Sequence, residues 1–559
     1  MNIFERFVAE PLQTKRTRRN FAIPADGKQG LTLFEDIMVV RNGDTVTAYD
    51  RRCDHNGGKL VSQPGTNIAS CPLHGWTFDA ESGTYTNVAV RKTPLTVVKT
   101  DAGYQAHIDL FTPLLDDVGD RSVSIRFINH ACVVVSFDGL SFASDPWLLG
   151  PAFCNGWWLK YKSPSNAIEI VNRCDFIFIS HNHPDHLHPE TLSQIRKDMP
   201  VLTAGFATGS AESYVRDLGF TNVLAAEFGS VYRDPVSGLR FTVLKSGDFR
   251  DDSGLYFTIG AFSGLLTVDC NALNFNMLPS PVTFLAAAFA GGASGFPLCF
   301  TNLEDTEKRR VLTRNRNAMI AGVKNYIEVS KPSVYMPYAG YFAEDPVRDE
   351  MVATNNLKNK PSDYLSVCRD SNTILADPTV EDTYVFFGDK LVESYQSEVR
   401  EIAQPDRNYY AQAWKTFGDI SFEEVASYFI GSGFRDNLIA YIGLSDEDFA
   451  PQEIYRVDFR ATPPSVQLCD EPQLQQIHNE TGARVTYARI RTPAFVETIR
   501  NLLPWEDLLI GFQARFDRVP NVYDSDFWYH FTNVHIKQRA RRAIADCGGS
   551  CSRISEAVF

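Results

Sequence analysis

Apolar and polar positions alternate through much of the first half of the chain, a pattern typical of β-strands. In residues 31–50 this alternation surrounds an Asn-Gly-Asp sequence at 42–44, and the pattern predicts a hairpin. Further strands are predicted at 124–128 and 132–136. The near-continuous apolar run 175–180 is typical of a strand that is buried on both faces.

Three further segments complete the predicted pattern. A helix is expected from Pro189, because proline suits the first helical turn, and residues 422–430 are amphipathic. Residues 282–300 carry no charge and have to be weighed as a membrane span. Glycines and a proline interrupt this stretch, so we expect a buried strand followed by a loop.

The charge balance argues against nucleic acid as a partner. The 559 residues include 54 Lys and Arg and 68 Asp and Glu, a net charge of −14, whereas a phosphate backbone requires a basic surface. The basic runs 15–19 and 537–542 are expected to be solvated tails or helix faces. Glu5, Glu10 and the lack of an apolar leader predict a chain that starts at Met1 and is soluble and cytoplasmic. The irregular spacing of 11 cysteines favours reduced thiols or metal ligands.

Two short segments each carry one cysteine and one histidine. Cys53 and His55 form a C-x-H sequence, and Cys71 and His74 form C-x-x-H after an interval of fifteen residues. Two Cys and two His on two loops are the ligands of a Rieske [2Fe–2S] cluster, in which thiolates hold one iron and imidazoles the other. Glycines after each pair let backbone N–H groups approach the sulfur atoms. These four side chains therefore predict an electron-relay cluster.

A structural zinc site is the alternative, since two Cys and two His also suit tetrahedral Zn²⁺. Zinc fingers usually pair like ligands within one short motif, whereas each loop here brings one ligand of each kind. That arrangement is what a two-iron cluster requires, and it favours the Rieske interpretation.

A second group of metal-binding side chains follows the predicted buried strand. His181, His183, Asp185 and His186 lie within six residues, in a chain that has only 11 histidines. This H-x-H-x-D-H arrangement is typical of metallo-β-lactamase-like proteins, because a loop at the end of a strand can turn several side chains toward two ions. We expect the first two histidines to serve one metal and the last two residues the other. A polar surface turn is the alternative.

A centre with two metals also needs a bridging carboxylate and further ligands. Asp269, at the end of an apolar run, is the expected bridge, and no histidine lies between His188 and that aspartate. Asp248 is the best placed carboxylate in this interval, while Asp251 and Asp252 are interpreted as solvated turn residues. Replacing imidazole by carboxylate moves the preference from zinc toward iron. Iron, unlike zinc, can use the electrons of a Rieske cluster.

A Rieske segment followed by such a histidine cluster resembles the CMP-N-acetylneuraminate hydroxylase (monooxygenase) family, which converts the N-acetyl group of the CMP-linked sugar to N-glycolyl. The likeness covers most of the chain and extends beyond the metal ligands. The segments that carry it are 129–132, 145–153, 156–158, 179–187, 267–270, 289–297, 337–342, 508–515 and 527–531.

The resemblance implies an O₂-dependent monooxygenase with a Rieske [2Fe–2S] cluster and a non-heme iron centre, expected to be dinuclear. The implied cluster ligands are Cys53, His55, Cys71 and His74; the implied iron ligands are His181, His183, Asp185, His186 and Asp269, with Asp248 as a further candidate. The implied partners are a small anionic substrate and an electron donor of the cytochrome b5 or ferredoxin/reductase type, linked to NAD(P)H. CMP-N-acetylneuraminate is the first candidate substrate.

Three features near these sites have more than one interpretation. The glycine-rich segment 290–295 offers either backbone N–H groups for an anion or a tight turn after a strand. His130 is expected to support the metal ligands, and His530 is expected to pack in the interior or line a pocket.

Two other functions stay open at this point. The first is a related oxygenase that oxidises carbon or nitrogen in another small metabolite. The second is a zinc-dependent hydrolase with a redox-sensing Rieske domain, which metal analysis would distinguish. A non-enzymatic electron carrier is disfavoured by the histidine cluster.

The chain is too long for one core, and we expect an α+β multidomain fold. The expected parts are an N-terminal tail (1–20), a β-rich Rieske domain (21–112), an αββα metallo-β-lactamase-like catalytic domain (121–345) and a mixed C-terminal region (346–559). The last part is expected to complete the substrate pocket or an interface.

Overall fold

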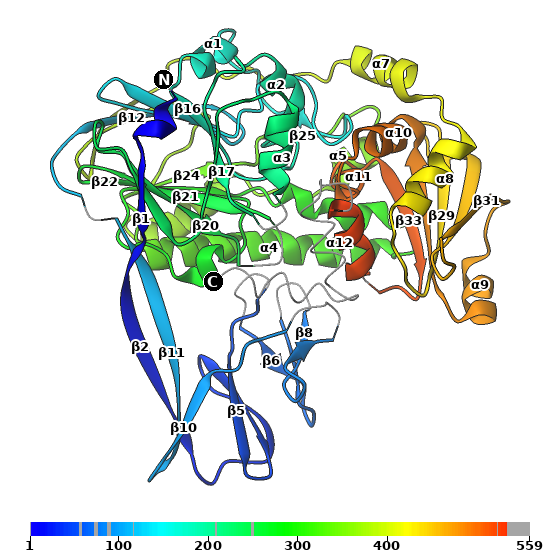
Figure 1. Cartoon of the computed structure of the whole chain (residues 1–559), viewed down its shortest axis with the longest axis horizontal. Coiled ribbons are helices and arrows are strands. Elements are labelled where there is room, and N and C mark those ends of the chain that lie inside the picture. The colour runs from blue at the N-terminus through cyan, green and yellow to red at the C-terminus, as the bar shows by residue number, and fades with distance from the viewer. Residues whose placement is uncertain are drawn as a thin grey trace.

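The computed structural model describes residues 2–54, 59–71, 76–86, 91–115, 117–206, 209–247, 251–522 and 524–533. Figure 1 shows a β-rich region that extends below the molecule, a central pair of large sheets, and a C-terminal sheet with its own helices to one side. The α+β, multidomain fold class predicted from the sequence is confirmed.

The β-rich region contains the predicted hairpin. Strands β4 (Ile37–Asn42) and β5 (Thr45–Asp50) pair across it, and Gly43 in the turn has φ +58°. Glycine suits such a turn because a positive φ costs it little. The other strands here are β3 (Gly30–Leu33), β6 (Val61–Ser62), β7 (Ile68–Ser70), β8 (Thr77–Asp79), β9 (Thr84–Tyr85) and β10 (Thr96–Thr100). Tyr49 and Phe78 lie in the small core that they enclose.

The prediction of an N-terminal tail over residues 1–20 is wrong for the described residues 2–20. The short 3₁₀ helix η1 (Ile3–Arg6) is followed by β1 (Val8–Pro11), which pairs with β19 (Ser230–Arg233) at the edge of a central sheet. Ile3 is buried, and the Phe7 ring packs 5.2 Å from that of Phe241. Apolar side chains therefore anchor this segment to the second domain.

Two long antiparallel strands connect the β-rich region to the central body. They are β2 (Gln13–Pro24) and β11 (Gly103–Leu114), which pair along their whole length. The basic run 15–19 lies on the exposed part of β2, where Arg18 forms an ion pair of 2.7 Å with Asp109. It is thus a solvated strand that is partly neutralised by its neighbour.

Two eight-stranded sheets face each other at the centre of the molecule. The first has the order β1-β19-β20-β21-β22-β23-β24-β26, and the second β18-β17-β16-β14-β13-β12-β27-β28. Strands of the first sheet are β20 (Arg240–Lys245), β21 (Ser253–Ile259), β22 (Phe262–Val268), β23 (Phe284–Ala288), β24 (Val334–Tyr338) and β26 (Ile374–Leu375). Strands of the second are β12 (Ser122–Asn129), β13 (Cys132–Phe137), β14 (Leu140–Ser144), β16 (Phe176–Ile179), β17 (Val201–Ala204), β18 (Val223–Ala226), β27 (Thr383–Phe387) and β28 (Lys390–Tyr395).

The main core lies between these sheets, and helices cover their outer faces. Phe142 and Phe257, one from each sheet, meet edge to face at 5.2 Å. Helix α3 (Ser210–Asp217) packs on β17 and β18, and α4 (Asp305–Ser330) packs on β23. The smaller elements are α1 (Ala167–Asn172), α2 (Pro189–Ser193), α5 (Glu350–Asn355), α6 (Leu365–Asp370), β15 (Trp158–Leu159), β25 (Phe342–Ala343), η2 (Leu273–Asn276), η3 (Gly292–Cys299) and η4 (Pro361–Tyr364).

The predicted end of the second domain at residue 345 is too early. Strands β26, β27 and β28 belong to the two central sheets although they lie within residues 374–395. No ligand motif marks residues 374–395 in the sequence. Only the strand pairing shows that these strands belong to the two central sheets. The expected strand and loop at 282–300 are found as β23 followed by η3. In the described part of the chain, every helix is too short or too polar to cross a membrane.

The C-terminal region forms a separate five-stranded sheet with the order β31-β30-β29-β32-β33. Its elements are α7 (Arg407–Phe417), α8 (Phe422–Gly431), β29 (Leu438–Ser445), β30 (Pro451–Asp458), β31 (Ser465–Leu468), α9 (Leu474–Thr481), β32 (Arg484–Arg491), α10 (Thr492–Asn501), α11 (Glu506–Ile510), β33 (Ala514–Val519) and α12 (Ser525–Asn533). The predicted amphipathic stretch is α8, whose first turn is capped reciprocally by Ser421 and Glu424. An aromatic core that includes Phe429 and Trp505 joins these helices to the sheet.

Candidate metal centre and cluster-binding loops

The histidine cluster lies where several strands of the two central sheets end. Strand β16 leads directly into residues 181–186, and the parallel neighbour β14 leads into Asp145. Strand β22 of the facing sheet leads into Asp269, and the turn between β12 and β13 supplies His130. Because these ends converge, side chains far apart in the sequence face one another in the interior.

The geometry joins the predicted ligands into one group. The Nε2 atom of His181 lies 2.9 Å from Nδ1 of His183. The Nε2 atom of His186 lies 3.4 Å from Oδ2 of Asp185 and 3.5 Å from Oδ2 of Asp269. The three histidines and Asp185 are each at most 6% exposed. The structure thus brings together five of the six predicted iron ligands.

These side chains fit a bound cation. The Nε2 atom of His186 and Oδ1 of Asp185 are buried and make no hydrogen bond, although buried polar atoms nearly always do. Three overlapping sets of ligand atoms lie within 4.8 Å of one another: His181, His183 and Asp252; His181, His186 and Asp269; and His130, Asp185 and His186. Several imidazole nitrogens and carboxylate oxygens aimed at shared points are what two neighbouring metal ions would use.

Asp252 joins the group of ligand atoms around His181 and His183. Asp248 lies outside the described residues. Asp252 is 3% exposed, and its Oδ1 atom lies 4.0 Å from Nε2 of His181, so the prediction that Asp252 is a solvated turn residue is wrong. Asp251 points elsewhere and accepts a hydrogen bond of 3.1 Å from the Ser210 hydroxyl. Asp252 therefore offers a carboxylate to this group, and Asp248 stays a prediction.

A second layer of polar groups orients the three histidines. The Nδ1 atom of His186 is 3.2 Å from Oδ2 of Asp145, and Nδ1 of His181 is 2.9 Å from the Ser180 hydroxyl. The Nε2 atom of His183 is 3.1 Å from Oε1 of Glu506 in α11. The sequence analysis did not identify Asp145 or Glu506 as site residues. The Asp145 segment was noted only for its family resemblance, and no local pattern marks Glu506.

His130 supports the ligands as predicted from its position after a strand. Its Nε2 atom lies 3.1 Å from Oδ2 of Asp185, and it is 1% exposed. Its ring also meets that of Trp147 edge to face at 5.0 Å. His130 therefore positions Asp185, and it can also reach a metal that Asp185 and His186 share.

Two other histidines, His188 and His530, belong to none of these ligand sets. Both ring nitrogens of His188 are occupied, by the Thr191 hydroxyl and by the carbonyl oxygen of Pro151, and burial lowers its pKa to about 4. His530 lies 2.9 Å from the carbonyl oxygen of Ser432 and packs against aromatic rings, and burial lowers its pKa to about 4. Both serve packing and local hydrogen bonding.

Burial and neighbouring charges set the protonation of the metal-free centre. Burial disfavours the charged form of His183, but the hydrogen bond and charge of Glu506, with two nearby aspartates, raise its pKa to about 9. Burial likewise opposes ionisation of Asp185 and His186. The mutual attraction of those two groups nevertheless holds the pKa of Asp185 well below, and that of His186 well above, the ordinary value. A metal would replace these protons, since its ligands bind in deprotonated form.

The cysteines of the predicted cluster site lie side by side in the β-rich core. Cys53 and Cys71 are each 2% exposed and pack in the same apolar group as Trp76. The backbone N–H of Asp54 donates to the Tyr85 hydroxyl at 3.1 Å, and Lys92 donates to the Arg52 carbonyl at 2.6 Å. His55 and His74 lie outside the described residues. The described part of both loops is thus held by the sheets around it.

The cluster-binding loops contact the second domain close to its metal centre. The Nη1 atom of Arg52, next to Cys53, donates a hydrogen bond of 3.0 Å to the carbonyl oxygen of Phe275. Phe275 belongs to η2, which follows Asp269 in the chain. The Tyr326 hydroxyl of α4 joins η2 to the residue after Asp269. It donates to the Cys270 carbonyl at 2.7 Å and accepts from the Leu273 N–H at 3.0 Å.

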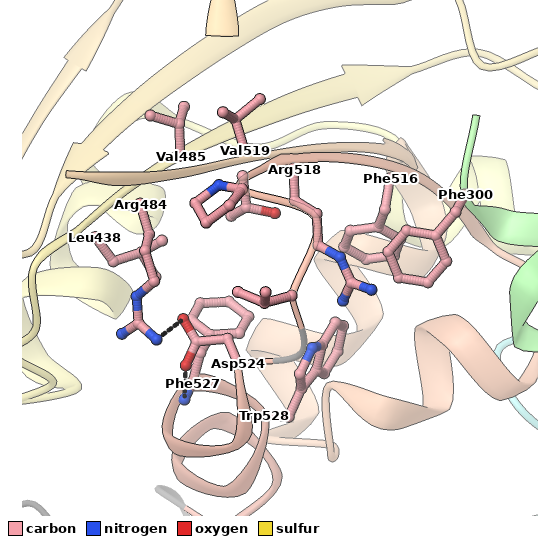
Figure 2. Close-up of a pocket in the computed structure, with 13 residues that line it drawn as sticks. Phe300, Leu438, Arg484, Val485, Phe516, Arg518, Val519, Asp524, Phe527 and Trp528 are labelled. Atoms are coloured by element: carbon pink, nitrogen blue, oxygen red, sulfur yellow. Dashed lines mark hydrogen bonds and ion pairs between the residues drawn. The ribbon is translucent and has the colours of Figure 1, made fainter. Parts of the chain in front are cut away.

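Among the described residues, the groups of three or more candidate metal ligands all lie at the histidine cluster. A cavity of about 30 Å³ in the C-terminal domain holds the Arg518 guanidinium, 4.4 Å from the Phe300 ring centre, and Trp528 (Figure 2). Arg484 on its other side is 3.4 Å from Asp524. In the glycine-rich segment, a Cβ atom on Gly295 would lie 2.7 Å from the Phe512 ring, so close packing explains that glycine.

Comparison with known proteins agrees with this arrangement. Residues 18–100 match the Rieske [2Fe-2S] domain, and residues 124–259 match the beta-lactamase superfamily domain. The chain is 27% identical over 548 residues to the cytidine monophosphate-N-acetylneuraminic acid hydroxylase of Xenopus laevis, covering 90% of this chain and 91% of that protein. The Mus musculus protein of the same name is 28% identical over 561 residues, which is 91% of this chain and 93% of that protein.

Among solved structures, CmlA, a diiron beta-hydroxylase from Streptomyces venezuelae, is 17% identical, with a TM-score of 0.33 over 50% of this chain and 55% of that one. The Rieske match makes a [2Fe–2S] cluster the cofactor of the β-rich domain. The predicted resemblance to the CMP-N-acetylneuraminic acid hydroxylases is thereby confirmed over nine-tenths of the chain, with a Rieske domain and a beta-lactamase superfamily domain in one polypeptide.

Proposed function

We propose that this protein is an iron-dependent monooxygenase that hydroxylates CMP-N-acetylneuraminate to CMP-N-glycolylneuraminate. In this reaction one atom of O₂ enters a C–H bond and the other leaves as water, which takes two electrons and two protons. The relatives over nine-tenths of the chain are named as hydroxylases of this substrate. The Rieske domain is the electron relay that such a reaction needs.

One observation carries the proposal. The cluster-binding loop is hydrogen-bonded, through Arg52 and Phe275, to the segment that follows the bridging candidate Asp269. A relay that contacts the segment after Asp269 has an acceptor for its electrons nearby. A zinc centre cannot accept electrons, so this contact favours a redox-active metal.

The donor set also suits iron. Three imidazoles and the carboxylates of Asp185, Asp252 and Asp269 form a harder ligand set than the histidine-rich sites typical of zinc. When bound, iron supplies the activation of O₂ that amino-acid side chains cannot provide. We propose that the centre holds two ions, because the ligand sets around His181 and His186 overlap without coinciding.

The residues of the chain prepare the site for this chemistry. Burial of the histidines keeps bulk water away from the metal ligands, and Asp145, Ser180 and Glu506 fix the ring orientations. The side chain of Asp269 is 24% exposed, so the centre opens on that side. A cavity of about 20 Å³ beside Asp269 and Met319 has room for a water-sized molecule.

Electrons must come from outside the chain, and we propose a cytochrome b5-type or a ferredoxin/reductase-type donor linked to NAD(P)H. Both kinds of donor deliver single electrons, which is what a Rieske cluster accepts. We also propose a cytoplasmic location. The nine described cysteines are all free of disulfides, which agrees with a reducing compartment.

Single turnover under ¹⁸O₂ tests the proposal. Protein reconstituted with both cofactors is reduced, mixed with CMP-N-acetylneuraminate, and the product is analysed by mass spectrometry. We expect the substrate to gain one labelled oxygen atom, and we expect no product from His186→Ala, which removes a metal ligand. An exposed substitution on α9, Glu480→Gln, serves as the matched control. Cleavage of the substrate with no gain of labelled oxygen, including cleavage with zinc alone, would identify a hydrolase; no product with both cofactors bound would reject this substrate.

A further inference from the structure

The metal-binding loop and the C-terminal domain meet at one pair of side chains. Glu506, the first residue of α11, places Oε1 3.1 Å from Nε2 of His183, although 323 positions separate the two residues. We propose that Glu506 is a positioning residue for His183, so that the metal centre is completed across a domain interface and metal binding is coupled to docking of the C-terminal domain. This inference rests on the metal centre of the proposed function but not on its substrate.

The two nitrogens of His183 have different tasks in this arrangement. Nδ1 lies 2.9 Å from Nε2 of His181, and both residues belong to one ligand set with Asp252. A ring nitrogen that binds a metal carries no proton, so the other nitrogen carries it and acts as a donor. For His183 that donor is Nε2, and the Glu506 carboxylate is its acceptor. Glu506 therefore fixes both the tautomer and the ring angle of the ligand.

The other two histidines receive the same support from within the second domain. Asp145 accepts from Nδ1 of His186, and Ser180 lies beside Nδ1 of His181. Only His183, among these three, depends on a residue of the C-terminal domain. The second domain by itself thus orients two ligands, and the third is oriented when α11 is in place.

A close interlock holds α11 in that position. The indole N–H of Trp157 donates to the carbonyl oxygen of Ile510 at 2.8 Å. A Cβ atom on Gly156 would lie 2.0 Å from the carbonyl oxygen of Gly511, so only glycine permits this approach. Phe153, in the same loop, packs its ring 5.9 Å from that of His183. One loop of the second domain therefore contacts both the metal ligand and the end of α11.

The backbone of this loop is strained, which is a feature of functional sites. Phe153, Cys154 and Asn155 have φ values of +52°, +51° and +66°, a run of left-handed conformations without glycine. Such a conformation persists only where the surroundings determine it. The contact with α11 provides these surroundings, and the loop in turn sets the distance between Glu506 and His183.

Coupling follows from these contacts. A metal that requires a fixed His183 binds more tightly when α11 is docked, and by reciprocity a bound metal stabilises the docked state. The chain would then hold its catalytic metal firmly only when the C-terminal domain is in place.

Zinc and cobalt titrations of the full-length protein, with its Rieske cluster intact and its second centre freed of metal, test the proposal without turnover. Glu506→Ala should weaken metal affinity about 10- to 100-fold, the usual cost of losing such a partner. Glu506→Gln keeps an acceptor oxygen and should restore most of the affinity. The visible spectrum of bound Co²⁺ should change with the alanine variant, because a reoriented imidazole alters the ligand geometry. Glu480 is an exposed glutamate of α9. The matched control is therefore Glu480→Ala, whose metal affinity and Co²⁺ spectrum should equal those of the unmodified protein.

Hydrogen exchange supplies the second readout. Amides of 506–511 should exchange more slowly with Zn²⁺ bound than without it, and this difference should disappear in Glu506→Ala. Unchanged zinc affinity in the alanine variant, or exchange of α11 that ignores the metal in the unmodified protein, would overturn the proposal. Because zinc is redox-inert, these outcomes do not depend on whether the protein hydroxylates CMP-N-acetylneuraminate.

Discussion

The two cofactor sites of this protein are built in opposite ways. The cluster-binding loops lie within residues 53–74 and are held by small sheets of one domain. The metal centre collects ligands from the ends of strands in two large sheets and takes Glu506 from a third domain. A local site of the first kind depends on loop spacing alone. The second kind depends on how whole domains pack, so distant substitutions should affect it.

The largest expected effect separates the two sites completely. Cys53→Ser should abolish the visible absorption and the electron paramagnetic resonance signal of the cluster, because a thiolate ligand of one iron is lost. The second centre should keep its metal. His186→Ala should lose the metal of the second centre and keep the signals of the cluster. Both variants should lose turnover. If Cys53→Ser also released the second metal, the two sites would have to be one structural unit.

A neighbouring pair of aspartates tests which carboxylate completes the metal centre. Asp252→Ala should weaken metal binding by more than about 100-fold, since a ligand itself is removed. Asp251→Ala removes a side chain that bonds to Ser210 and belongs to none of the three ligand sets, so it should bind metal normally. Metal content after dialysis, with competitive titration, measures both. Equal losses in the two variants would contradict the assignment of Asp252.

The pH dependence of stability should also distinguish the metal centre in its metal-free form. The pKa of His183 is about 9 in the folded protein and 6.5 in its ordinary environment, so protonation of His183 stabilises the fold. That contribution, roughly 3 kcal/mol at 1.36 kcal/mol per pKa unit, is complete below pH 6.5 and is lost as the pH rises through 9. Urea unfolding of chelator-treated protein at several pH values measures it. His183→Asn should lack this part of the pH dependence. An unchanged profile in that variant would contradict the assignment of the effect to His183.

The smallest effect is expected where the two sites meet. Arg52→Met removes a charge-assisted hydrogen bond to Phe275, which is worth about 1.5–3 kcal/mol, and should slow reoxidation of the cluster by about tenfold. Both cofactors should stay bound. Stopped-flow spectroscopy of the reduced protein with O₂ and substrate measures the rate. The midpoint potential is measured in parallel, so that a change in driving force is recognised.

Lys59→Met is the matched control for this junction, because Lys59 is exposed and pairs with Asp36 inside the β-rich domain. An unchanged rate in Arg52→Met would mean that electrons reach the metal centre by a path that does not involve this contact.

The sequence by itself determined the features that depend on short spacing. The Cys and His pairs, the H-x-H-x-D-H segment after a buried strand, and Asp269 at the end of another strand are all defined by neighbours in the chain. Strand patterns also predicted the β-rich first domain and three strands of the second central sheet, β12, β13 and β16, because alternation and continuous apolar runs report burial directly.

Only the tertiary structure decided which distant residues join these segments. Asp252, interpreted as a solvated turn residue, is buried beside His181 immediately before β21, and Glu506 reaches His183 because Gly156 and Gly511 allow their backbones to touch. The N-terminal segment became part of a central sheet through its pairing with β19. Contacts of this kind bring together residues hundreds of positions apart, so no local periodicity or spacing records them.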